Sequence, residues 1–266
     1  MPETGFRISV LSLFNPYTWL VVYRNFVVWR SFLIPSIIGN FGEPILYLLA
    51  MGFGLGKIIL PEKLGGVPYD VFLAPGLLVS TAMYTATFEC TFGSFTRLKT
   101  QKTFEGILTT PVQVGELAAG EIIFGALKST IGVAMVLLVL LLFGLIWSPL
   151  AVLAIPAGFV VGFMFSSAAL IVTSFSPDYQ FFNYYFTVII APMFLFSGIF
   201  FPINEMPDWV RALAWFFPLT HAVDICRSLT TGALHPDFLI KILWMLIFCL
   251  ISFEIAVRRI GKRLIK

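Results

Sequence analysis

The sequence has few charged residues and few of the side chains that usually hold metals or carry out catalysis. Only 12% of its 266 residues are charged, whereas 59% are hydrophobic, and this balance excludes a soluble protein. The two histidines and three cysteines show neither ligand spacing nor a CxxC pair, so neither a metal site nor a disulfide framework is predicted. We therefore expect a polytopic membrane protein that binds no metal or cofactor of its own.

The sequence also lacks a phosphate-binding loop of the form Gly-x-x-x-x-Gly-Lys-Ser/Thr. The nearest match, residues 52–57, has the wrong spacing and is followed by Ile58. If the protein works with ATP, a second subunit must therefore bind and hydrolyse it, and we expect ATP and Mg²⁺ on that partner.

Six apolar segments are long enough to cross a hydrocarbon layer of ~30 Å. They are residues 31–56, 71–95, 118–146, 150–175, 181–201 and 238–257. Six spans leave both termini on one side, which we assign to the cytoplasm because most basic residues then lie inside. The inside group is Arg7, Arg24, Arg30, Arg97, Lys99, Lys102, Arg258, Arg259, Lys262, Arg263 and Lys266, and the outside group is Lys57, Lys63, Arg211 and Arg227. The basic excess thus reflects topology and contact with membrane lipid, and no nucleic-acid partner is predicted.

Residues 15–30, ahead of the first predicted span, mix aromatic and basic side chains in a helical pattern. This pattern favours a helix lying in the inner membrane interface, and the alternative is an extension of the first span. Arg24 and Arg30 interrupt the apolar residues here, so we expect no cleaved signal peptide.

Residues 202–232, between the fifth and sixth predicted spans, hold short apolar stretches that Pro218 separates. Helices this short cannot cross the bilayer, so we predict a re-entrant or interfacial helical hairpin. His221, Asp224 and Arg227 recur at helical spacing, and no nucleophile motif accompanies them. We interpret them as a structural clasp at an outer gate. The predicted hairpin and gate residues are Gly198, Pro202, Pro207, Trp209, His221, Asp224 and Arg227.

The loop of residues 97–116 is the only sizeable predicted cytoplasmic segment between spans. Within it, Phe104, Ile107 and Leu108 would share one side of a short helix, with Glu105 exposed and Pro111 following. Such a turn suits a socket on a soluble partner. The pattern fits equally well an amphipathic turn that rests on the bilayer.

Glu43, Glu89 and Lys128 fall inside predicted spans, where a charged residue costs roughly 2.5 to 3.5 kcal/mol on insertion scales. Glu89 and Lys128 lie at depths that allow them to pair, and we expect a structural ion pair rather than a proton relay. Glu43 precedes Pro44, so it either caps a break in the first span or faces a polar path.

Short motifs along nearly the whole chain resemble permease subunits of type-2 ABC exporters, in particular the nodulation-type lipo-oligosaccharide export permease. In the front half they are Tyr23-Arg24-Asn25-Phe26, Trp29, Gly39-Asn40, Glu43-Pro44, Tyr47-Leu48-Leu49 and Gly54-Leu55-Gly56. The predicted cytoplasmic loop adds Phe104-Glu105, Thr109-Thr110-Pro111 and Glu116. The hairpin adds Gly198-x-x-Phe201-Pro202-x-x-x-Met206-Pro207-x-Trp209, Pro218-Leu219-Thr220-His221 and Arg227.

This resemblance implies a non-enzymatic half-transporter, in which two copies of the chain pair with two soluble ATPase subunits. It favours coupling to the ATPase through the loop, by Phe104, Glu105, Ile107, Leu108 and Pro111. It also implies that the first and fifth spans meet at the dimer centre, where the candidate path residues are Asn40, Glu43, Tyr185 and Phe194.

The resemblance further implies outward movement of a lipo-oligosaccharide, glycolipid or polysaccharide across the inner membrane of a bacterium. The alternatives are an exporter of drugs or other lipids, a proton-coupled secondary transporter and a membrane-embedded enzyme. The secondary transporter is disfavoured because titratable groups near the bilayer centre are few and no internal repeat is visible. The enzyme is disfavoured because the sequence has no clustered His, Asp or Cys ligands.

Overall fold

The computed structural model describes residues 9–56, 58–59, 61–64, 66–233 and 236–265, and every regular element within these ranges is a helix. The α-helices are α1 (Pro16–Arg30), α2 (Leu33–Leu55), α3 (Tyr69–Phe88), α4 (Thr103–Leu108), α5 (Val114–Leu142), α6 (Ala154–Phe175), α7 (Gln180–Tyr185), α8 (Ala191–Phe196), α9 (Asp208–Phe216), α10 (Pro218–Thr231) and α11 (Phe238–Leu264). The π-helices are η3 (Glu89–Gly93), η4 (Thr96–Thr100) and η6 (Phe186–Ile190). The 3₁₀ helices are η1 (Ser9–Phe14), η2 (Pro61–Leu64), η5 (Pro149–Leu153) and η7 (Ile203–Glu205).

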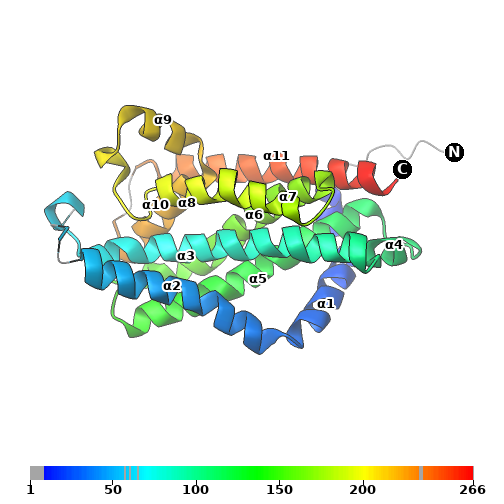
Figure 1. Ribbon diagram of the computed structural model, residues 1–266, viewed down its shortest axis with the longest axis horizontal. Coiled ribbons are helices and arrows are strands. Elements are labelled where there is room, and N and C mark those ends of the chain that lie inside the picture. Colours follow the sequence, from blue (N-terminus) through cyan, green and yellow to red (C-terminus); the bar gives the residue numbers. More distant parts are fainter. Residues whose placement is uncertain (1–8, 57, 60, 65, 234–235, 266) are drawn as a thin grey trace.

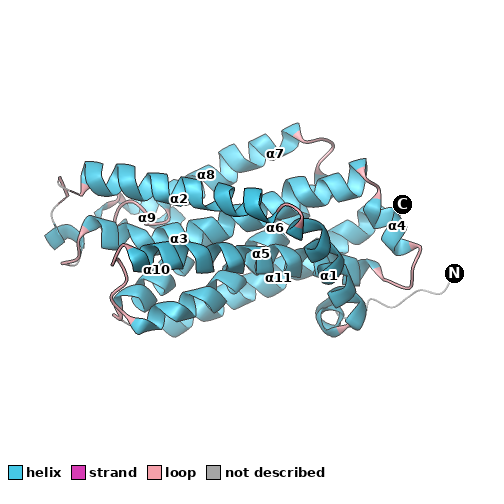
Figure 2. Cartoon of the chain, turned by 90° about the horizontal axis from the view of Figure 1, so that it is seen from below, coloured by secondary structure: helices cyan, strands magenta, loops and turns pink. Residues whose placement is uncertain are grey.

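The long helices α2, α3, α5, α6 and α11 lie roughly along one axis and form an elongated bundle (Figure 1). Helices α1 and α4 lie at one end, together with the C-terminal end of α11, and we call this the α4 end. Helices α9 and α10 lie at the opposite end, the α9 end. The view from below gives the same arrangement and shows how short most of the connecting loops are (Figure 2).

Helix α3 lies at the centre of the bundle and packs against α2, α5, α6 and α10. In the apolar window of the continuous helix Tyr69–Thr100, 89% of the residues are buried, against 22% for α11. Helices α5 and α6 approach closely because Gly158 and Gly162 present no side chain: a Cβ atom at Gly162 would lie 2.7 Å from Cβ of Ser129. The glycine pair thus acts as a small-x-x-x-small motif, which allows two membrane helices to approach closely.

Local signals in the sequence account for where several helices begin and end. Asn15 caps α1, because its Oδ1 atom accepts a hydrogen bond from the backbone N–H of Tyr17 at 3.1 Å, and Pro16 occupies the first helical position. A capping box starts α5, in which Glu116 Oε2 accepts from the backbone N–H of Gln113 at 2.8 Å. Helix α10 ends at Thr231 and is capped by Gly232, whose φ of 81° suits glycine.

Four described helical segments are long and apolar enough to cross a membrane. They are Tyr69–Thr100, Val114–Leu142, Pro149–Phe175 and Phe238–Leu264, and they match four of the six predicted spans. The first predicted span forms α2, a 23-residue helix with Pro44 in its interior. The fifth forms the apolar helix Gln180–Phe196, which is shorter than these four. The six-span count therefore stays a prediction.

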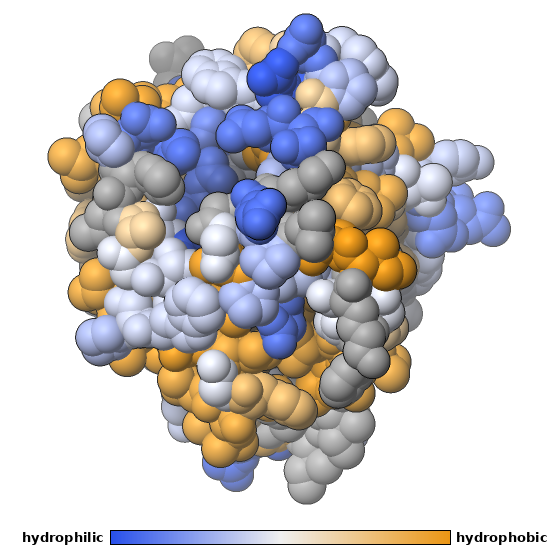
Figure 3. Space-filling view, turned by 90° about the vertical axis from the view of Figure 1, so that its left-hand side faces the viewer, coloured by the Kyte–Doolittle hydropathy of each residue, from blue (hydrophilic) through white to orange (hydrophobic). Residues whose placement is uncertain are grey.

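The segment predicted as a hairpin contains two short helices, α9 with 9 residues and α10 with 14. At a rise of 1.5 Å per residue they measure about 14 and 21 Å, less than the thickness of a bilayer core. They lie at the α9 end, where polar and apolar side chains are mixed and polar ones are more frequent in the upper half of the view (Figure 3). Whether this hairpin re-enters the membrane stays a prediction.

Candidate functional site

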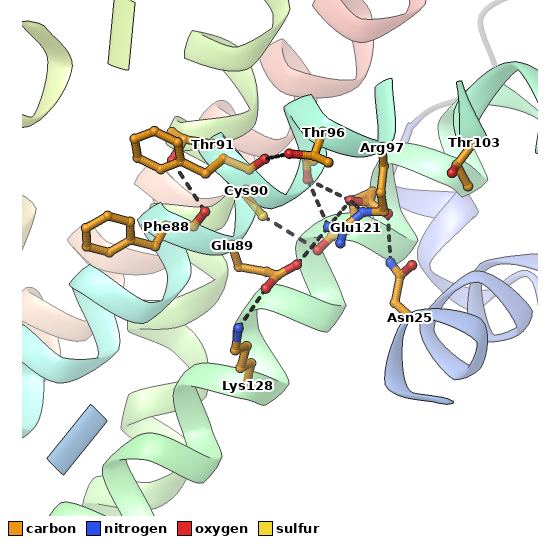
Figure 4. A network of polar contacts seen from close by, with 12 residues as sticks. Asn25, Phe88, Glu89, Cys90, Thr91, Thr96, Arg97, Thr103, Glu121 and Lys128 are labelled. Carbon is orange, nitrogen blue, oxygen red and sulfur yellow. Dashed lines mark hydrogen bonds and ion pairs between the residues drawn. The ribbon is translucent and has the colours of Figure 1, made fainter. Parts of the chain in front are cut away.

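Four charged side chains meet inside the bundle, in the half of the Tyr69–Thr100 helix that leads to α4 (Figure 4). Lys128 Nζ lies 2.8 Å from Glu89 Oε2, so the pair expected from the sequence is brought together. Arg97 Nη2 lies 2.8 Å from Glu89 Oε1 and 2.6 Å from Glu121 Oε2. We call Glu89, Arg97, Glu121 and Lys128 the charge cluster.

The charge cluster is satisfied by neutral donors as well as by its own opposite charges. Asn25 Nδ2 donates to Glu121 Oε1 at 2.7 Å, and the Ser94 hydroxyl donates to Glu121 Oε2 at 2.6 Å. Glu121 has no exposed surface and Glu89 is also buried, so both carboxylates depend on these partners. Buried charges are tolerated when they are paired and hydrogen-bonded, and each oxygen of these two carboxylates has at least one partner.

The backbone around the charge cluster is π-helical. Glu89 opens η3, and Arg97 lies in η4, a few residues further along the same continuous helix. A π-helical turn is wider than an α-helical one, is rare, and occurs frequently at functional sites. Arg97 was predicted in the cytoplasmic loop, and Glu121 was not among the residues predicted from the sequence. The available signal was an acidic residue inside the apolar run 118–146, which needs a basic partner.

Helix α1 covers one side of the charge cluster. It contributes Asn25 to Glu121, and one turn later the Trp29 ring lies 6.0 Å from Lys128 Nζ. Trp29 Nε1 donates to the Ser36 hydroxyl at 3.1 Å, which ties the end of α1 to the start of α2. Residues 15–30 are therefore a helix of their own, set at an angle to α2 (Figure 1).

The predicted coupling segment contains a short helix, α4, but its side chains face differently from the prediction. Phe104 was expected on the partner-facing side with Ile107 and Leu108, whereas it is 0% exposed and packs in a core with Leu98 and Leu117. In a helix of only six residues, the largest ring takes the position that removes most apolar surface from water. The residues that face outward are Glu105, Gly106, Thr109, Thr110 and Pro111, while Ile107 and Leu108 are half-buried.

The candidate path residues fall into two groups. The side chains of Asn40 and Glu43 lie outside the described residues. Tyr185 and Phe194 are only 7% and 4% exposed in one chain. Phe194 makes edge contacts with the rings of Tyr84 and Phe200, at 5.5 and 5.0 Å between centroids.

In the outer hairpin, Arg227 connects α10 to two other parts of the chain. Its Nη2 atom donates to the carbonyl of Gly198 at 2.8 Å, and its guanidinium carbon lies 3.9 Å from the centroid of the Phe72 ring. Asp224 Oδ1 lies 3.8 Å from Arg227 Nη1, and Asp224 Oδ2 lies 2.9 Å from Lys241 Nζ. Burial lowers the pKa of Arg227 to about 10, an effect that Asp224 opposes, so this side chain remains a cation at neutral pH.

His221 packs against α11 and does not contact Asp224 through a hydrogen bond in the described structure. Its Nε2 atom lies 2.8 Å from the carbonyl oxygen of Trp215, which accepts, and its ring lies 4.7 Å from that of Trp244. Burial lowers the pKa of His221, although the Trp215 carbonyl and Asp224 act in the opposite direction. Pro202 precedes η7, and Pro207 and Trp209 lie at the start of α9, where Trp209 is exposed.

Comparison with known proteins decides the family. Residues 13–230 match the family model described as ABC-2 type transporter. The chain belongs to the ABC-2 type transporter family. The type-2 ABC permease family expected from the motifs is thereby confirmed. Four long apolar helices among the described residues make this ABC-2 transporter chain a multi-pass membrane protein.

Curated relatives of this ABC-2 transporter chain cover most of its length. It is 33% identical to nodulation protein J of Sinorhizobium fredii over 260 residues, and this aligned region covers 97% of this chain and 98% of the relative. It is 33% identical over 220 residues to nodulation protein J of Rhizobium meliloti, covering 82% of this chain and 83% of the relative. A more distant relative, the inner membrane transport permease YadH of Escherichia coli, is 22% identical over 246 residues, covering 91% and 93%.

Proposed function

We propose that this chain is the permease subunit of an ATP-driven exporter that moves a lipo-oligosaccharide, glycolipid or polysaccharide outward across a bacterial inner membrane. The observation that carries the proposal is the similarity to nodulation protein J over nearly the full length of both chains. The sequence has no phosphate-binding loop, so ATP and Mg²⁺ would bind to a separate soluble ATPase subunit. Two permeases and two ATPases would form the transporter.

The outward face of α4 would be the contact with the ATPase. It carries Glu105, Gly106 and the segment Thr109 to Pro111, all exposed, while Phe104 fixes the helix to the bundle from inside. A short helix anchored by a buried ring can transmit a push from a partner to the helices behind it. The N-terminal helix α1 would lie in the inner membrane interface, because Trp19, Tyr23 and Phe26 are exposed on it.

The path would open between two copies of the chain, around α2 and the helix Gln180–Phe196. Tyr184, Val188 and Leu195 are exposed in one chain, which supports a contact of this face with a second copy. Tyr185 and Phe194 are buried now, and would reach the path only when the helices separate. All six predicted segments would then span the membrane, with both termini and α4 in the cytoplasm.

The α9 end would hold the outer gate. Arg227, Gly198 and Phe72 join α10 to α3 and to the end of α8, which favours a clasp that keeps the hairpin closed. Transport would require α9 and α10 to move together, since only Phe217 separates the end of α9 from Pro218, which opens α10.

The proposal is tested by purifying the chain in lipid with the ABC ATPase encoded nearest to it and measuring ATP hydrolysis. We expect stable co-purification and hydrolysis that rises when a lipo-oligosaccharide is added. An ATPase variant that cannot hydrolyse ATP is the control. Stimulation by apolar drugs alone would favour the drug-exporter alternative, and a folded permease that recruits no ATPase would contradict the proposal.

A further inference from the structure

Arg97 is the centre of the charge cluster and connects three positions. Its Nη2 atom contacts Glu89 in the same continuous helix and Glu121 on α5, and its Nε atom donates to Glu121 Oε2 at 3.0 Å. Ser94 accepts a weaker hydrogen bond from Nη2 at 3.3 Å. The guanidinium group therefore bonds to Glu89 and Glu121 at once. The compact ammonium group of a lysine does not reproduce this geometry.

The contact between Glu89 and Arg97 reaches across η3 to the start of η4. Glu89 is the first residue of η3 and Arg97 is the second residue of η4, so their ion pair holds the two π-helical segments in one register. If a π-helical turn relaxes to an α-helical one, the residues beyond it rotate by about 100° relative to those before it. The ion pair between these two residues is not compatible with such a rotation.

The opposite side of the same π-helical stretch carries aromatic rings that face the helix Gln180–Phe196. Phe88, the last residue of α3, lies 4.5 Å from Phe186, and Phe92 of η3 lies 6.0 Å from Phe186 and 5.1 Å from Phe182, measured between ring centroids. Phe186 opens η6, the π-helical segment of that helix. The π-helical segments η3 and η6 thus meet through their aromatic rings. The helical register of η3 determines whether its rings contact those of the helix Gln180–Phe196.

The α4 end of the stretch is joined to the predicted coupling segment. Leu98, in η4 and next to Arg97, packs in the same core as Phe104 of α4 and Val21 of α1. A displacement of α4 therefore acts on the residue beside Arg97. Asn25 of α1 contacts the same carboxylate as Arg97, so α1 is attached at the same point.

We infer that Arg97 is a positioning residue that holds the π-helical register of residues 89–100 and so links α4 to the helix Gln180–Phe196. Its bridge between Glu89 and Glu121 keeps Phe88 and Phe92 against Phe182 and Phe186 in the resting protein. This inference rests on the proposed function, since it assigns α4 to the ATPase and the helix Gln180–Phe196 to the path. Without the bridge, a movement of α4 no longer displaces the helix Gln180–Phe196 by a defined amount.

The direct test measures the distance between α4 and η6 in the permease alone. Spin labels are placed at Glu105→Cys and Val188→Cys, which are exposed positions, and labelled chains are diluted with unlabelled ones so that each distance belongs to one protomer. The native cysteines Cys90, Cys226 and Cys249 are buried and are not expected to react. We expect a single narrow distance distribution in the otherwise unchanged chain and a broad or shifted one in Arg97→Gln.

The matched control is Lys99→Gln, which removes the same charge two residues away. Lys99 is exposed and donates to the Pro177 carbonyl outside the charge cluster, so its distance distribution should stay narrow. Arg97→Lys keeps the charge but loses the fork, and we expect an intermediate distribution. If Arg97→Gln does not fold, Arg97→Lys alone decides. Distributions of the folded Arg97 variants that match those of the unsubstituted chain and of Lys99→Gln would overturn the inference.

A second readout separates coupling from folding. In the reconstituted complex we expect Arg97→Gln to hydrolyse ATP while exporting at least about fivefold less substrate per ATP, and Lys99→Gln to remain unchanged. An equal amount of substrate exported per ATP hydrolysed in the two variants would overturn the inference. If the unsubstituted complex exports nothing with ATP, the proposed function fails, whereas the distance measurement on the permease still decides the role of Arg97.

Discussion

The Nζ atom of Lys128 on α5 lies 2.8 Å from Oε2 of Glu89 in η3, although 39 positions separate the two residues in the sequence. Both side chains are mostly buried, so the opposite charge of each offsets the cost of burying the other inside a low-dielectric bundle. The contribution of this pair to the free energy of unfolding therefore shows how the protein tolerates charge within its helices.

A double-mutant cycle of Glu89→Gln and Lys128→Met should therefore be non-additive. Glu89→Gln leaves Lys128 without its anionic partner, and Lys128→Met leaves Glu89 with Arg97 alone, whereas the double change removes both charges of the pair. We therefore expect a coupling free energy of about 1–3 kcal/mol. The free energy of unfolding in mild detergent is the measurement. Strict additivity of the two changes would show that the pair contributes nothing.

Phe104 and Glu105 are neighbours on α4 with opposite roles. Phe104→Ala should lower the free energy of unfolding by about 3–5 kcal/mol, because the ring is fully buried. Glu105→Ala should change it by less than about 0.5 kcal/mol and instead weaken co-purification with the ATPase. Thermal unfolding and co-purification of both variants are compared. A Phe104→Ala protein of unchanged stability would contradict the inward position of the ring.

Gly120 of α5 allows α1 to dock, since a Cβ atom there would lie 2.6 Å from Cβ of Val21 and 3.1 Å from the carbonyl of Thr18. Gly120→Ala should therefore displace α1, at a cost of about 1–3 kcal/mol, and make Arg24 and Arg30 easier for trypsin to reach. Gly106→Ala is the matched control, because nothing lies within 4 Å of its Cβ position. Equal cleavage rates in the two variants would contradict the close approach of α1 and α5.

The outer hairpin should lose stability in acid through His221. Its Nε2–H group donates to Trp215, and its Nδ1 atom is buried without a partner in the described structure, so a second proton is unfavourable. Because burial lowers its pKa in the folded state, the unfolded state binds more protons below pH ~6.5, and the free energy of unfolding decreases as the pH falls.

This pH dependence is measured by thermal unfolding between pH 5 and 8, values chosen to bracket the ~6.5 of an exposed histidine. His221→Gln keeps an amide donor for the Trp215 carbonyl but does not titrate, so its curve should be flatter. Parallel curves for the two proteins would show that His221 does not titrate on unfolding.

The long helices were predictable from the sequence because a bilayer imposes a length and a composition on every span. Residues 71–95, 118–146, 150–175 and 238–257 all lie within or overlap long apolar helices of the structure. The break between α9 and α10 was also predictable, since Pro218 lacks the N–H that would continue a helix. Glu89 and Lys128 meet because two costly charges at matching depth have few other partners.

Other parts of the site needed the structure. Glu121 belongs to an apolar run, and its partners Arg97 and Asn25 come from elements that only the fold brings to α5. The π-helical turns have no sequence pattern of their own, because they depend on how neighbouring helices pack. The inward position of Phe104 depends on a core built by Leu98 and Leu117, which flank α4 in the sequence but lie on different helices.

The most direct test of the account is ATP-dependent uptake of a labelled lipo-oligosaccharide into inside-out proteoliposomes that contain the permease and its ATPase. The account predicts accumulation that needs both subunits and hydrolysable ATP and that persists when the proton gradient is dissipated. Accumulation by the permease alone, abolished when the proton gradient is dissipated, would contradict it and identify a secondary transporter.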